Sequence, residues 1–222
     1  MKCYIRALFP RLEFGIVVVG AFGSFVAGSV LAFFDPSGPV PISNAQLQDV
    51  VVYELVAAAI LLTFLRIRNW TLQSVGVSPS LQGTLVGVGL AAAAYLIYVV
   101  VFLISAVLSP HIAQVVATQA LVAPGLNVAL VIAASIVNPV FEELFVCGYV
   151  VTALREHRGF WTAVNVSIAI RLLYNLYQGP IGVLSIIPLG FVFAHWLGRT
   201  ARLWPVIVAH AIFDFLGLLA GG

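Results

Sequence analysis

Two adjacent carboxylates, Glu142 and Glu143, lie inside a long apolar run of the sequence. An acid near the centre of a bilayer costs about 3 kcal/mol even on the modest insertion scales. Two neighbouring acids also repel each other, which favours one of them holding a proton. Ionisable residues at such depth usually do chemistry, so this pair is the first candidate for a site that activates water or binds a cation.

Further polar side chains fall on helical spacings in the same and in other apolar runs. Ser135, Asn138 and Glu142 follow the spacing i, i+3, i+7 and therefore share one face of a helix. Two more stripes are Arg171, Asn175 and Gln178, and His210 with Asp214. Three stripes on three helices predict one buried cavity. The further residues expected to line it are Asn138, Tyr174, Cys147 and Glu54.

Not every polar residue in a membrane helix belongs to a site. A single amide often only joins two helices, at about 0.6 kcal/mol on average, and we assign Gln178 to that class. Glu54 needs a partner inside its helix bundle, and the sequence leaves its role open between structure and function.

Composition sets the fold class. The 222 residues are 62% hydrophobic and 8% charged, with a mean hydropathy of +1.12, whereas soluble domains carry about 25% charged residues. We therefore expect an all-α polytopic membrane protein whose partner is the lipid bilayer. The net charge of +2 does not indicate nucleic acid, and no structural disulfide is expected between Cys3 and Cys147.

Apolar runs divide the chain into about seven membrane helices. Their expected ranges are 14–34, 48–65, 85–108, 126–152, 160–177, 181–198 and 203–220. Residues 109–124 are expected to add an interfacial turn of helix. In the absence of a repeat, we expect a single integral membrane domain over residues 1–222, with N-terminal helices in 1–125 and a core in 126–220.

The basic residues orient these helices. With a cytoplasmic N-terminus, all Lys and Arg residues except Arg171 fall in inner segments. These segments are 1–13, 66–82, 153–159 and 199–202. Cytoplasmic loops carry such an excess of positive charge. We therefore expect the N-terminus inside and the C-terminus outside, in a bacterial plasma membrane.

Three stretches in the second half of the chain resemble the motifs of a known family. They are Glu142-Glu143-Leu144-Phe145-Val146-Cys147-Gly148, Arg171-Leu172-Leu173-Tyr174-Asn175 and His210-Ala211-Ile212-Phe213-Asp214. The family is CPBP, the CAAX proteases and bacteriocin-processing (Abi) proteins, with motifs Glu-Glu-x-x-x-Arg, Phe-x-x-x-His and His-x-x-x-Asn or Asp. The resemblance implies a helical core of that family and an intramembrane glutamic endopeptidase.

The resemblance also implies roles for single residues. In that family the first glutamate and the motif histidine are thought to activate water, while the last motif stabilises the oxyanion. Carried over, Glu142 is the base beside Glu143, and His210 with Asp214 forms the oxyanion group. The position of the motif histidine holds Asn175, whose amide can hold a water but cannot take its proton.

Two further departures compensate each other. The motif arginine is replaced by Cys147 and the motif phenylalanine by Arg171. An arginine at position 147 would lie one helical turn from Glu143. We expect Arg171 to supply that charge, within ion-pair reach of a glutamate, which favours a rebuilt site over a dead one.

Several functions remain open at this stage. The first is a hydrolase that cleaves a membrane-embedded or lipidated peptide. The second is a diverged family member that acts as a membrane scaffold. The third is a metal-dependent membrane enzyme, in which Glu142, Glu143, His210 and Asp214 would hold iron, manganese or zinc, although no Glu-x-x-His spacing supports it. A transporter is disfavoured because no internal repeat is visible.

Overall fold

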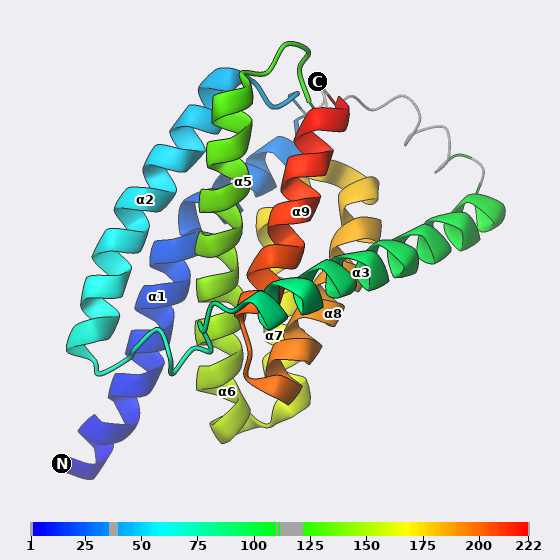
Figure 1. Ribbon diagram of the computed structural model, residues 1–222. Helices are drawn as coiled ribbons and strands as arrows, with labels where there is room; N and C mark the ends of the chain where they lie inside the picture. The colour runs from blue at the N-terminus through cyan, green and yellow to red at the C-terminus, as the bar shows by residue number, and fades with distance from the viewer. Residues whose placement is uncertain (1, 36–39, 110, 112–121, 222) are drawn as a thin grey trace.

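Long helices that run between two ends of the molecule make up most of the structure (Figure 1). This computed structural model describes residues 2–35, 40–109, 111 and 122–221. Its longer helices are α1 (Lys2–Phe33), α2 (Asn44–Ile67), α3 (Leu81–Leu108), α5 (Val128–Glu142), α6 (Val150–Arg158), α7 (Phe160–Tyr174), α8 (Gly179–Thr200) and α9 (Trp204–Gly221). A π-helical segment η1 (Glu143–Tyr149) joins α5 to α6, and a 3-10 turn η2 (Leu176–Gln178) precedes α8.

The expected all-α membrane protein is confirmed. Four helical stretches are long and apolar enough to cross a membrane, namely Arg11–Phe33, Asn44–Ile67, Leu81–Leu108 and Val128–Arg158. Shorter apolar helices cover Phe160–Tyr174 and Trp204–Ala220. The total of about seven spans stays a prediction, and the turn expected at 109–124 lies almost wholly outside the described residues.

The helices lie where the apolar runs predict them, and local capping shifts their ends by a few residues. α2 begins at Asn44 because Ser43 and Gln46 form a capping box, each side chain bonding the backbone N–H of the other. The helix that carries the glutamates continues to Arg158, past its expected end. Gly159 ends it there with a φ of 86°, in the left-handed region that favours glycine.

The links between helices alternate between the two ends (Figure 1). The link at 68–80, the break at Gly159 and the link at 201–203 lie at the end that the N-terminal part of α1 approaches. The turn η2 and the C-terminus lie at the other end, here called the outer end. This alternation is the one expected from the basic residues. Which end faces the cytoplasm stays a prediction from charge.

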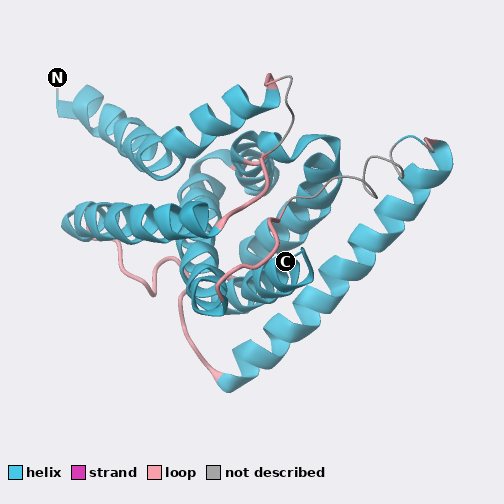
Figure 2. Cartoon of the chain, turned by 90° about the horizontal axis from the view of Figure 1, so that it is seen from above, coloured by secondary structure: helices cyan, strands magenta, loops and turns pink. Residues whose placement is uncertain are grey.

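Helix α3 meets the bundle through small residues. Gly87 is buried against α9, and a Cβ there would lie 2.7 Å from Val208 Cβ and 2.8 Å from the Pro205 carbonyl oxygen. Only glycine permits so close an approach. Ala94 is the last buried residue along α3. The C-terminal part of the helix diverges from the bundle in both views (Figures 1 and 2). Its outer part exposes mostly apolar side chains, as lipid contact requires.

The helix that carries the glutamates is widened at its middle. Regular α5 gives way at Glu143 to η1, all of whose residues are buried, and α6 continues from Val150. Hydrogen bonds in a π-helix span five residues, so one turn holds an extra residue; such segments are frequent at functional sites. The widening therefore sets how the side chains after Glu142 are directed.

Candidate active site

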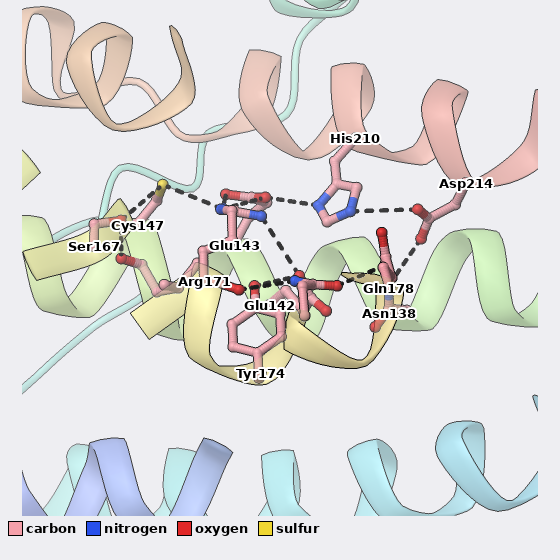
Figure 3. Close-up of polar contacts among 12 residues, drawn as sticks. Asn138, Glu142, Glu143, Cys147, Ser167, Arg171, Tyr174, Gln178, His210 and Asp214 are labelled. Carbon is pink, nitrogen blue, oxygen red and sulfur yellow. Dashed lines mark hydrogen bonds and ion pairs between the residues drawn. The ribbon is translucent and has the colours of Figure 1, made fainter. Parts of the chain in front are cut away.

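The three polar stripes converge between α5–η1, α7 and α9 (Figure 3). Glu142 and Glu143 lie at the junction of α5 and η1, Arg171 and Tyr174 lie in the last turn of α7, and His210 lies on α9. α9 packs against α5, and α7 packs against η1. The side chains point into the space between these helices and form one connected network (Figure 3).

Glu143 is the centre of this network. Arg171 Nη2 donates to both of its carboxylate oxygens at 2.7 and 2.8 Å, and His210 Nδ1 lies 2.6 Å from Oε1. The exposed fractions of the Arg171 and Glu143 side chains are 1% and 0%. A buried ion pair is stable only when such contacts satisfy both partners. Glu143 is therefore suited to be a fixed counter-charge.

Glu142 is the more accessible glutamate, with 15% of its side chain exposed. Its contacts with the described residues go to Oε2, where the Tyr174 hydroxyl donates at 2.5 Å and Arg171 Nη1 at 3.5 Å. Both donors stabilise an ionised carboxylate. Because Oε1 lies outside these contacts, Glu142 is the acid of the pair that is suited to accept a proton.

His210 bridges two carboxylates. Its Nε2 lies 3.3 Å from Asp214 Oδ1, opposite the shorter Nδ1 contact with Glu143. The second oxygen of Asp214 accepts a hydrogen bond from Asn138 Nδ2 at 2.8 Å. This chain of contacts holds the imidazole ring in one orientation. The longer contact, at Nε2, is the one that a developing oxyanion could replace.

Cys147 is fully buried on the far side of the guanidinium from Glu142. Its sulfur lies 3.8 Å from both Arg171 Nη2 and Ser167 Oγ, and Ser167 donates to the Val146 carbonyl oxygen at 2.7 Å. Sequence reasoning gives Ser167 no weight, because serine is common in membrane helices. Its position one turn before Arg171 is the one signal that points to it.

The side chain of Asn175 bonds to the C-terminal end of its own helix, α7. Its Nδ2 donates to the Arg171 carbonyl oxygen at 2.9 Å, and its Oδ1 accepts from Gln178 Nε2 at 2.8 Å. Asn175 thus caps α7, which ends at the preceding residue. Among the contacts of the described residues, Asn175 reaches the network through the Arg171 backbone, whereas the resemblance placed it beside a water at Glu142.

Glu54 belongs to α2, which packs against α5. Its side chain is buried, with a relative exposure of 1%, and neither carboxyl oxygen has a hydrogen-bond partner among the described residues. It lies close enough to Glu142, His210 and Asp214 to interact with them electrostatically. Glu54 thus adjoins the network, and its place in the lining of a cavity stays a prediction.

A metal fits this arrangement poorly. One ligand atom from each of Glu142, Glu143 and His210 lies within 4.8 Å of the others, a spacing that would suit one divalent cation. Arg171 Nη2, however, already lies 2.7 Å from Glu143 Oε1. A guanidinium and a metal ion at the same oxygens repel each other strongly. The donor set would hold a metal only after Arg171 had moved away.

The comparison with protein families matches residues 124–216 to the family described as type II CAAX prenyl endopeptidase, Rce1-like. This segment, less than half of the chain, is thus similar to that family, which supports the CPBP resemblance of the three motifs. The family is one of membrane endopeptidases, and the matched segment contains all three motif stretches. No curated protein and no solved structure matches the chain.

The likeness to this family bears on the expected exchange of charge. The position of the motif arginine, Cys147, and the arginine of the next helix, Arg171, both border the same glutamate. Because the guanidinium of Arg171 lies against the Cys147 sulfur, it occupies space that a longer side chain at position 147 would need. In this chain the positive charge beside Glu143 therefore comes from α7, and its exchange with the motif arginine stays a prediction.

Proposed function

We propose that the protein is an intramembrane endopeptidase in which Glu142 activates water for attack on a peptide bond. The observation that carries this proposal is the difference between the two glutamates. Arg171 and His210 occupy both oxygens of Glu143, whereas Glu142 is partly exposed and meets donors at one oxygen. One carboxylate thus supplies charge, and the other is free to take a proton.

The proposed substrate is a membrane-embedded or lipidated peptide. The family description, a CAAX prenyl endopeptidase, supports a prenylated peptide in particular. The apolar surfaces of the helices would allow a lipidated chain to approach laterally from the bilayer.

In the proposed reaction, Glu142 takes a proton from water as the oxygen attacks the carbonyl carbon. His210 then donates from Nε2 to the oxyanion in place of its 3.3 Å contact with Asp214. Removing a donor of this kind usually costs about 100- to 1,000-fold in rate. Asn175 cannot exchange a proton, and it caps α7, so Asn175→His, which restores the residue of the motif, should keep or raise the activity of a peptidase with a weakened base.

The test uses purified protein in liposomes and a prenylated CAAX peptide that carries a fluorophore and a quencher. Glu142→Gln should abolish cleavage, because an amide cannot accept the proton of water. Glu156→Gln is the matched control, since Glu156 is exposed near the end of α6, away from the network. If Glu142→Gln protein cleaves as fast as the control, the proposal is wrong and a scaffold role is favoured.

A metal-dependent hydrolase is the second candidate, because Glu142, Glu143 and His210 lie at a spacing that could hold one ion. Elemental analysis of the purified protein separates it from the first. Cleavage that is lost on treatment with a chelator and restored by zinc, manganese or iron would favour this candidate. Cleavage that persists after exhaustive chelation would exclude the metal-dependent hydrolase and favour the mechanism in which Glu142 activates water.

A further inference from the structure

An apolar cluster separates the Glu142 site from the outer end of the molecule. Leu47, Val131 and Ala134 are buried in it, and Val51 and Leu218 pack against them. The cluster joins α2, α5 and α9 and is called the apolar cap below.

Directly beneath the apolar cap, each of these helices carries polar side chains. Glu54 follows Val51 by one turn on α2, Asp214 precedes Leu218 by one turn on α9, and α5 adds Ser135 and Asn138 after the cap. Asn138 and Asp214 bond to each other, but the Ser135 hydroxyl and both Glu54 oxygens are buried without a partner among the described residues. This polar layer adjoins the Glu142 network through Asp214 and His210.

The charges of the layer and the network do not balance if every acid is ionised. The described cluster sets the carboxylates of Glu54, Glu142, Glu143 and Asp214 against Arg171 and His210, which carry at most two positive charges. A proton on one acid lowers the excess negative charge. Glu54 is the acid that lacks a donor, and an ionised carboxylate buried without one is far less stable than a neutral carboxyl group. Glu54 is therefore the acid that holds a proton, whereas the negative charge that remains lies on Glu142, which has the donors Tyr174 and Arg171.

We propose that Glu54 is a further catalytic residue of the endopeptidase, which donates its proton to the leaving amine. This inference rests on the proposed function. The water oxygen bonds to the carbonyl carbon while Glu142 takes one water proton. The carbon–nitrogen bond then breaks, and the amine nitrogen takes the proton of Glu54. The proton on Glu142 returns to Glu54 through water, so both acids regain their starting states.

A second acid is needed for proton transfer because Asn175 stands in the place of the motif histidine. The family's histidine would share proton transfer with the first glutamate, but Asn175 cannot take or give a proton and caps α7. Both ring nitrogens of His210 already face carboxylates. Glu54 is the remaining acid near Glu142 whose hydrogen-bonding groups have no partner among the described residues, and it comes from a helix outside the matched segment.

The test compares two prenylated substrates that differ only at the cleaved bond, one an amide and one an ester with a phenolate leaving group. A phenolate leaves without being protonated, whereas an amine does not. Glu54→Gln keeps the shape and neutrality of the protonated acid but cannot donate as an acid. We expect kcat for the amide to fall by about 100- to 10,000-fold, with KM and the rate on the ester little changed.

Two variants complete the design. Glu142→Gln should lose activity on both substrates, because both need an activated water. Asp49→Asn, an exposed acid on the same helix as Glu54, should change neither rate. Glu54→Gln protein that cleaves the amide at the wild-type rate, or that loses ester and amide cleavage equally, would overturn the role of Glu54. If Glu142→Gln is also fully active, the proposed function itself is wrong.

Discussion

Two arginine–glutamate pairs in this protein have the same short contact in different surroundings. Arg171 Nη2 lies 2.7 Å from Glu143 Oε1, with side-chain exposures of 1% and 0%. Arg68 Nε lies 2.7 Å from Glu13 Oε2, with exposures of 37% and 11%. The first pair lies in the bundle interior, and the second lies at the end of the molecule where the basic residues gather.

The partners around each pair differ as well. Glu13 also accepts from Trp70 Nε1 at 2.9 Å and from the Tyr149 hydroxyl at 3.2 Å, so it ties α1 to the link after α2 and to the end of η1. Water can replace Arg68 there if the ion pair breaks. The Glu143 side chain is 0% exposed, so losing Arg171 there leaves a buried carboxylate with His210 but without its guanidinium. Although the two ion pairs have equal contact distances, we therefore expect them to contribute unequally to the free energy of unfolding.

The largest effect is expected from Arg171→Leu. Removing one partner of a buried ion pair typically costs about 3–5 kcal/mol, because the other charge is left uncompensated. The free energy of unfolding, from denaturant titration in detergent micelles, should fall by this amount. Gln178→Leu removes a polar side chain of the same region and should cost much less. Equal losses in the two variants would contradict the assignment of Arg171 as the counter-charge.

The next effect is a partial rescue that tests the exchange of charge. Cys147→Arg places a guanidinium one turn from Glu143, and the Arg171→Leu change vacates the space beside it. Neighbouring sites of this kind couple by about 0.5–3 kcal/mol. The double variant should therefore be more stable than Arg171→Leu alone, although Cys147→Arg by itself should destabilise a buried site that already holds a cation. If the loss of unfolding free energy in the double variant equals the sum of the losses in the two single variants, the exchange of charge is contradicted.

A smaller effect is expected at the exposed pair. Arg68→Ala should lower the free energy of unfolding by about 1 kcal/mol or less, since an ion pair open to water contributes about 0.2–1 kcal/mol. The measurement is the same titration used for Arg171→Leu. A loss as large as that of the buried pair would show that burial does not separate the two pairs.

The smallest effect is a difference in salt dependence. At about 1 M salt the screening length is near 3 Å, so exposed charges lose most of their attraction. The stability difference between wild type and Arg68→Ala should shrink between low and high salt by a few tenths of a kcal/mol. The difference for Arg171→Leu should stay constant within error. A buried pair that weakened with salt would indicate water beside Glu143.

The sequence alone determined the helices and the residues that had to be explained. Apolar runs predict the membrane helices because burying backbone polar groups in lipid requires intra-helical hydrogen bonds. The acids and Arg171 stand out because ionisable groups at that depth are costly. The family motifs, and the replacement of one arginine by another, could be read before any contact was known. These features are local in the chain, so spacing and composition reveal them.

Only the tertiary structure decided which partner each side chain takes. Glu143, and not Glu142, holds the closest contact with Arg171, and it lies where α5 gives way to the π-helical η1. Asn175 bonds within its own helix end, and Glu54 meets the site from a helix distant in sequence. Helical periodicity defines a face, but the rotation and depth at which two helices pack define the contact. Those quantities depend on the whole bundle.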